Sequence, residues 1–135
     1  MNSPAYDIAA LLATNNLGAV GTSIFRTRMP DSPDELIFVS STVSGAPEIS
    51  TGSAGSRFNN IDKPHVQVLI RANVNKNSTG YATAVSVKNL LHGIAPFTLN
   101  GSRYISILAI SDIAELGVDA KLRPVFSINF RIERS

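Results

Sequence analysis

The chain has 135 residues, of which 44% are apolar and 16% charged, with a formal net charge of +2 and no cysteine. This length suits one domain with its own core, and the lack of thiols excludes disulfides and thiolate metal sites. No apolar stretch approaches the roughly 18 residues of a membrane span and no secretory signal opens the chain, so we expect a single domain over residues 1–135 without membrane contact.

The first 60 residues predict a helix, two strands and a long loop. Ser3-Pro4 is a favourable helix start, and Gly18 ends the helix after apolar residues at helical spacing. Segments 22–28 and 35–41 read as strands, and the proline- and aspartate-rich turn between them predicts a hairpin. Residues 42–60, rich in Gly, Ser, Thr and Asn, predict a flexible loop, and loops of this length are usually functional or disordered.

The middle of the chain predicts a strand and a second helix. Alternate residues of segment 65–72 are apolar, which is typical of a strand with one buried face. Asn77 or Ser78 is the expected cap of the helix. Its apolar stripe has steps of three and four residues, and it consists of Tyr81, Ala84, Val87, Leu91 and Ile94.

The last third predicts a hairpin, a linking segment and a final strand. Asn100-Gly101 is a favoured two-residue turn between strands, because both residues tolerate positive φ. Residues 111–124 read as a link with about one helical turn, and strict alternation predicts a strand over 125–133. The whole order predicts an α+β fold, with a mainly antiparallel (mixed) β-sheet and two helices packed on one face.

The strand at residues 103–110 raises a question, because both of its faces are mostly apolar. Tyr104 and Leu108 are expected on one face, and Ile105 and Ile107 on the other. A neighbouring subunit is one possible cover for the second face. The alternatives are helices on both faces of the sheet and a strand that is simply central.

Few residues suggest catalysis or metal binding. Neither His65 nor His92 has a carboxylate nearby in the sequence that would argue for a triad. Residues 50–57 have the composition of a phosphate-binding loop but lack its order and its lysine. Two groups of acidic residues lie in a turn and in a link, where ordinary turn roles explain them; they are Asp31, Asp34 and Glu35, and Asp112, Glu115 and Asp119. We expect no catalytic residue, no cofactor and no metal site.

The order of four stretches carries a further signal. They are a Pro/Asp turn in IFRTRMPDSPDE, a D-x-P-x-V-Q-V strand in DKPHVQVLIRA, a helix ending in Leu-His-Gly in AVSVKNLLHGI, and an Asn-Gly hairpin followed by RPVFSINFRI. Together, over about residues 5–134, they resemble the small minor capsid or tail terminator proteins of long-tailed bacteriophages. The loop at 42–60 departs from that pattern, so no contact in the loop is carried over.

The resemblance implies a structural virion protein without catalytic residues, assembled in the host cytoplasm. Tail terminators form a homo-oligomeric ring, commonly a hexamer, at the head-proximal end of the tail. The ring caps the tail tube, ends its polymerisation and joins it to the head-side connector, while DNA passes through the lumen without specific binding. A head–tail connector or stopper is the alternative at the same junction. A small nucleic-acid-binding module, with a basic stripe and stacking aromatic residues, or an enzyme would belong to other classes.

The residues themselves agree with an assembly role. A charged fraction of 16%, against about 25% in typical soluble domains, resembles an interface core, although a slightly under-charged monomer has it too. A ring needs two complementary patches per subunit. The candidate contacts are Arg57, Arg71 and Arg131, since arginine suits interface ion pairs, with Tyr104 and Leu108 on the two-sided strand. Each arginine is otherwise a solvated surface charge.

Overall fold

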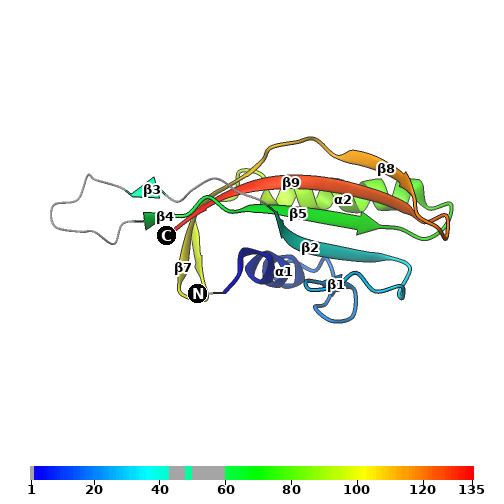
Figure 1. Cartoon of the computed structure of the whole chain (residues 1–135), viewed down its shortest axis with the longest axis horizontal. Coiled ribbons are helices and arrows are strands. Elements are labelled where there is room, and N and C mark those ends of the chain that lie inside the picture. The colour runs from blue at the N-terminus through cyan, green and yellow to red at the C-terminus, as the bar shows by residue number, and fades with distance from the viewer. Residues whose placement is uncertain (1, 43–47, 50–59) are drawn as a thin grey trace.

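The computed structural model describes residues 2–42, 48–49 and 60–135, and it confirms the α+β class (Figure 1). The elements follow the chain in the order α1 (Pro4–Thr14), β1 (Ile24–Phe25), β2 (Leu36–Thr42), β3 (Glu48–Ile49), β4 (Asn60–Ile61), β5 (His65–Arg71), α2 (Asn77–Leu91), β6 (Phe97–Leu99), β7 (Ser102–Ala109), β8 (Ala114–Val118) and β9 (Pro124–Arg134). In the described residues, no helix is both long and apolar enough to cross a membrane.

Strand β9 organises the mixed sheet, whose strand order is β1-β2-β5-β9-β7-β6. One edge of β9 pairs with β5 along its length, while β8 and β7 follow each other along the opposite edge. Strand β9 has 11 residues, which is long enough for both neighbours. Strand β7 ends where Ala109 pairs with Phe130, and β8 begins where Ala114 pairs with Ser127. The predicted hairpin at Asn100-Gly101 joins β6 to β7, and both turn residues have positive φ.

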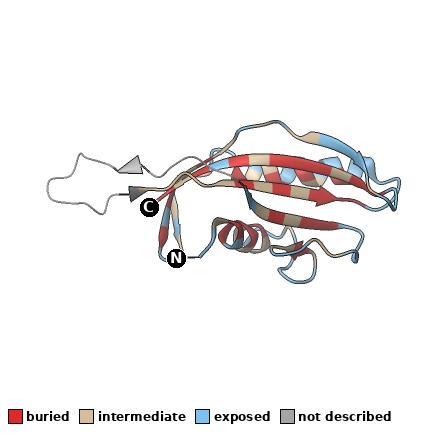
Figure 2. Cartoon of the chain, in the orientation of Figure 1, coloured by how far each residue is buried: buried red, intermediate tan, exposed pale blue. Residues whose placement is uncertain are grey.

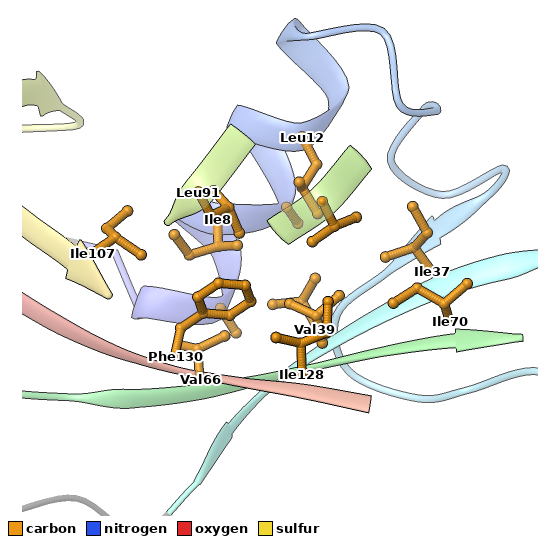
Figure 3. Packing of buried hydrophobic residues seen from close by; sticks show 14 of the residues in the cluster. Ile8, Leu12, Ile37, Val39, Val66, Ile70, Leu91, Ile107, Ile128 and Phe130 are labelled. Carbon is orange, nitrogen blue, oxygen red and sulfur yellow. The ribbon is translucent and has the colours of Figure 1, made fainter. Parts of the chain in front are cut away.

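Both helices cover the same face of the sheet, as predicted. Helix α1 begins at the Ser3 cap, whose side chain accepts a hydrogen bond from the Tyr6 amide at 3.4 Å. Figure 3 shows Ile8 of α1 and Leu91 of α2 pointing toward Phe130 in the centre of the core. The alternation expected in β5 and β9 is visible in Figure 2, where buried and half-buried positions follow one another.

A β-bulge in β7 answers part of the question about the two-sided strand. The register shifts between Tyr104 and Ser106, so that Tyr104 pairs with Arg134 and Ile107 with Ile132. A bulge inserts one residue and reverses the alternation. The expectation that Tyr104 and Leu108 share a face is therefore wrong: Tyr104 is fully buried in the core, while Leu108 is half-buried on the face away from the helices.

Two expectations about strands are wrong. The predicted hairpin over 22–41 is instead a parallel pair, with Ile24 opposite Ile37. The chain returns through segment 26–35 to the level of Ile24, and β2 then runs in the same direction as β1. A tight turn would instead have reversed the chain and made the two strands antiparallel. The predicted link 111–124 contains strand β8, which lacks a strand pattern because nearly all of its residues are exposed.

Helix α2 begins at Asn77, so the expectation that Asn77 or Ser78 caps it is wrong: Lys76 stands at the cap position, without a side-chain capping hydrogen bond. The buried stripe differs from the expected one at its start, and the helix ends at Leu91, before Ile94. Gly80 is buried beside Ala84, whereas Tyr81 is 45% exposed and meets the ring of Phe126 edge-on at 6.1 Å. The predicted loop 42–60 lies mostly outside the described residues. Its described part pairs β3 with β4 in a short antiparallel ladder that was not predicted.

Candidate assembly surfaces

Arg71, a predicted subunit contact, is buried at the end of β5 and bonded within the chain. Its Nε donates to the carbonyl of Asp34 at 2.9 Å, and its Nη2 donates to the carbonyls of Pro30 and Pro33 at 2.8 and 2.7 Å. Burial lowers the pKa of Arg71. The side chain therefore fixes the turn between β1 and β2, and its role at a subunit contact stays a prediction.

Arg123, the residue before β9, holds the same turn. It forms ion pairs with Asp119 at 2.8 Å, Asp34 at 3.0 Å and Asp31 at 3.1 Å, and Lys121 also pairs with Asp31. Three residues of the two acidic groups noticed in the sequence, Asp31, Asp34 and Asp119, thus meet in space, where Arg123 and Lys121 neutralise them. Within the described parts of the chain, no group of acidic, histidine or cysteine side chains is arranged to hold a metal ion.

The Asp119–Arg123 pair predicts a dependence of stability on pH. The hydrogen bond from Arg123 lowers the pKa of Asp119 from 3.8 to about 2. The carboxylate therefore stabilises the fold above pH 3.8, and this contribution is lost as the pH falls through about 2. We expect Asp119→Asn to be less stable than the natural chain at pH 6, with the difference shrinking between pH 4 and pH 2. Urea unfolding of both proteins across this range measures it, and a difference that stays constant would contradict the ionic role.

A second polar cluster ties the two ends of the chain to the β6–β7 hairpin. Asp7, in the first turn of α1, is 1% exposed. It accepts hydrogen bonds from the Tyr104 hydroxyl and from Asn100 Nδ2, the latter at 2.8 Å, and lies 3.7 Å from Arg134 Nη1. Burial and, to a smaller extent, the hydrogen bond to Asp7 raise the pKa of Tyr104. Tyr104 thus has a structural role inside the subunit, and its predicted interface role is untested.

The other predicted contacts lie in different places. Arg131 is exposed and stands beside the half-buried Leu108 on the face of the sheet that carries neither helix. Arg57 lies outside the described residues. His92 ends α2, where its Nδ1 accepts a hydrogen bond from the Ala109 amide at 2.9 Å. Of the four predicted contacts within the described residues, the structure therefore brings Arg131 and Leu108 together, whereas Arg71 and Tyr104 are buried elsewhere.

Sequence reasoning missed three exposed apolar residues on and just after β8. Leu116 and Val118 in this strand and Leu122 in the turn after it are 57%, 58% and 63% exposed. Strand β8 pairs with β9 on one side and, among the described residues, has no strand on the other. Figure 2 shows most of this strand as exposed. We name these three residues the β8 patch.

A hollow lies beside β1, at the edge of the sheet opposite β8. Its volume is about 260 Å³, and Val20, Phe25 and Pro30 are among its lining residues together with Arg26 and Arg28. We name these five residues the β1 hollow. Arg26 is fixed over the ring of Tyr6, 4.1 Å from its centroid, while Arg28 is exposed.

The β8 patch and the β1 hollow lie at the same level of the sheet. Successive strand pairings connect them through one row of residues across five strands, namely Ile24, Ile37, Ile70, Phe126 and Glu115. The row spans about 19 Å, because neighbouring strands lie about 4.8 Å apart. One subunit thus carries two different surfaces, at the two ends of one row.

Comparisons with known proteins agree with this fold. A family model described as bacteriophage tail terminator protein matches residues 11–135. A solved chain from the virion of a native gene transfer agent particle is 19% identical, with a TM-score of 0.55 over 94% of this chain and 83% of that chain. A second solved chain is 7% identical, with a TM-score of 0.58 over 96% and 89% of the two chains. At these identities the two structures support the fold alone, and no protein with a curated description matches the chain.

Proposed function

We propose a capping role in tail assembly for this chain, which belongs to the bacteriophage tail terminator family and is a structural component of the virion tail. Several copies form a ring, with six as the expected number, on the head-proximal end of the tail tube. The ring stops the addition of tube subunits and offers its other side to the head-side connector. DNA passes through the lumen without specific contacts. The match to the family over residues 11–135 is the observation that carries the proposal.

The surfaces of the subunit support a ring. A closed ring is built from head-to-tail contacts, which require two different patches on each subunit. The β8 patch and the β1 hollow are two such surfaces: the patch is apolar with Glu115 beside it, and the hollow combines apolar side chains with Arg26 and Arg28. An interface of this kind has an apolar centre and a polar rim. Leu108 and Arg131, on the face without helices, are our candidates for contacts with the tube or the lumen.

Polymerisation of the tail tube protein tests the function directly. We expect the chain, added to growing tubes, to bind at one end and to shorten the tubes, as measured by electron microscopy of tube lengths with and without it. Tubes of unchanged length with bare ends would overturn the proposal. Binding to the purified connector without any effect on tube growth would favour the alternative role as a connector or stopper.

A further inference from the structure

We propose that the β8 patch of one copy docks on the β1 hollow of the next copy, so that copies of this chain join head to tail. This contact rests on the proposed ring and names the surfaces that would build it. The partner is therefore a second copy of this chain, and the contact uses side chains more than backbone.

The β8 patch is suited to a side-chain contact. Its strand is an edge with exposed leucine and valine side chains, and exposed apolar groups on one strand are candidates for an interaction site. The register of β8 shifts between Glu115 and Val118, and Gly117 has a φ of +85°. A bulge of this kind twists an edge and hinders the addition of a further strand. The apolar side chains are then the main means of contact.

The β1 hollow offers a receptor whose lining is partly apolar. Val20 is 36% exposed and belongs to the lining with Phe25 and Pro30. The free edge of β1 is itself covered by the preceding turn, because Ile24 donates to the carbonyl of Ala19 at 3.0 Å and accepts from the Gly21 amide at 2.9 Å. No strand can therefore be added here, so the hollow also favours side-chain insertion.

Charge complementarity selects a second copy as the occupant. Glu115 is exposed beside the β8 patch, and Arg28 is exposed at the β1 hollow. Neither side chain forms an ion pair with any other described residue. Docking of the patch on the hollow would bring these opposite charges together, and complementary charges at an interface rim fix its orientation.

The placement of the two surfaces makes the contact repeatable. Because they terminate the same row of the sheet, each copy that presents its β8 patch keeps its own β1 hollow free for the next. Such a heterologous contact generates a ring when the rotation closes and a filament when it does not. A contact of the β8 patch with itself would instead stop at a dimer.

Cysteine cross-linking tests the contact, since the natural chain contains no cysteine. We would combine Leu116→Cys with Val20→Cys and oxidise the full chain at high concentration and on tail tubes. We expect a ladder of dimers, trimers and higher multiples, and no species beyond the dimer from either single variant. The matched control joins Leu116→Cys to Val74→Cys, whose position is also exposed but lies outside the hollow. Its ladder should be absent.

The outcomes separate the contact from the function. A ladder in either setting supports the contact, whatever the tube lengths show. Absence of the ladder in both settings overturns it. The contact is also overturned if the cysteine of Leu116→Cys is protected from alkylation on tubes while no cross-link ladder forms, because the occupant would then be the tube protein. As a second measurement, Glu115→Arg and Arg28→Glu should each weaken self-association about tenfold or more, whereas the double variant should recover it.

Discussion

Replacing Asp7 with alanine is expected to lower the free energy of unfolding by about 3–5 kcal/mol, the cost of removing one partner of a buried ion pair. The carboxylate is 1% exposed, accepts hydrogen bonds from Tyr104 and Asn100, and forms an ion pair with Arg134 at 3.7 Å. Arg134 already has an Nε atom without a hydrogen-bond partner among the described residues. Its guanidinium would then be buried without a counter-charge, keeping mainly its bonds to the Asn2 carbonyl at 2.9 Å and to the Tyr104 hydroxyl at 3.3 Å.

Urea denaturation of a small variant set measures this effect and identifies its cause. Tyr104→Phe removes the hydroxyl alone and should cost about 1 kcal/mol. The double variant Asp7→Ala with Arg134→Met removes both charges, so its loss should be smaller than the sum of the two single losses. Additive losses, or a loss below about 1 kcal/mol for Asp7→Ala alone, would show that the ion pair does not hold α1 against the end of β9.

This cluster also shows where sequence reasoning stops. The helix start at Ser3, the Asn100-Gly101 turn and the alternation in β9 are local signals, and the structure confirms each of them. Asp7 and Tyr104 are 97 residues apart in the chain, and no local pattern announces their contact. Tyr104 reached the core through a bulge, which the simple alternation of a strand cannot anticipate.

The surfaces proposed for assembly were missed for a related reason. Periodicity reveals a buried face, but nearly every residue of β8 is exposed in the single chain, so no alternation marks it as a strand. The β1 hollow depends on the parallel pairing of β1 with β2, whereas the proline-rich turn suggested a hairpin. Arg71 was selected as an interface cation, yet the turn carbonyls that it binds are 37 to 41 residues away.

Gly80→Ala is the other substitution expected to have a large effect on the fold. A Cβ atom at this position would lie 2.6 Å from Cε2 of Phe126 and 2.8 Å from Cβ of Ala72. Phe126 is fully buried and Ala72 is 1% exposed, so neither neighbour has space to move. Overpacking of this kind costs about 1–3 kcal/mol, against a gain of about 1 kcal/mol from the better helix propensity of alanine. We expect a net loss of stability.

Ala82→Gly in the same helix isolates the propensity part, because Ala82 is exposed and its replacement should cost about 1 kcal/mol by propensity alone. Combining Gly80→Ala with Phe126→Leu should recover part of the loss if the aromatic ring is the obstacle. A Gly80→Ala variant as stable as the natural chain would contradict the close packing of α2 on β9.

Phe126 also pairs with Glu115 of β8, so a displaced ring would shift the β8 patch. We therefore expect Gly80→Ala to weaken the Leu116–Val20 cross-link as well, which links the depth of the helix packing to the surface proposed for assembly.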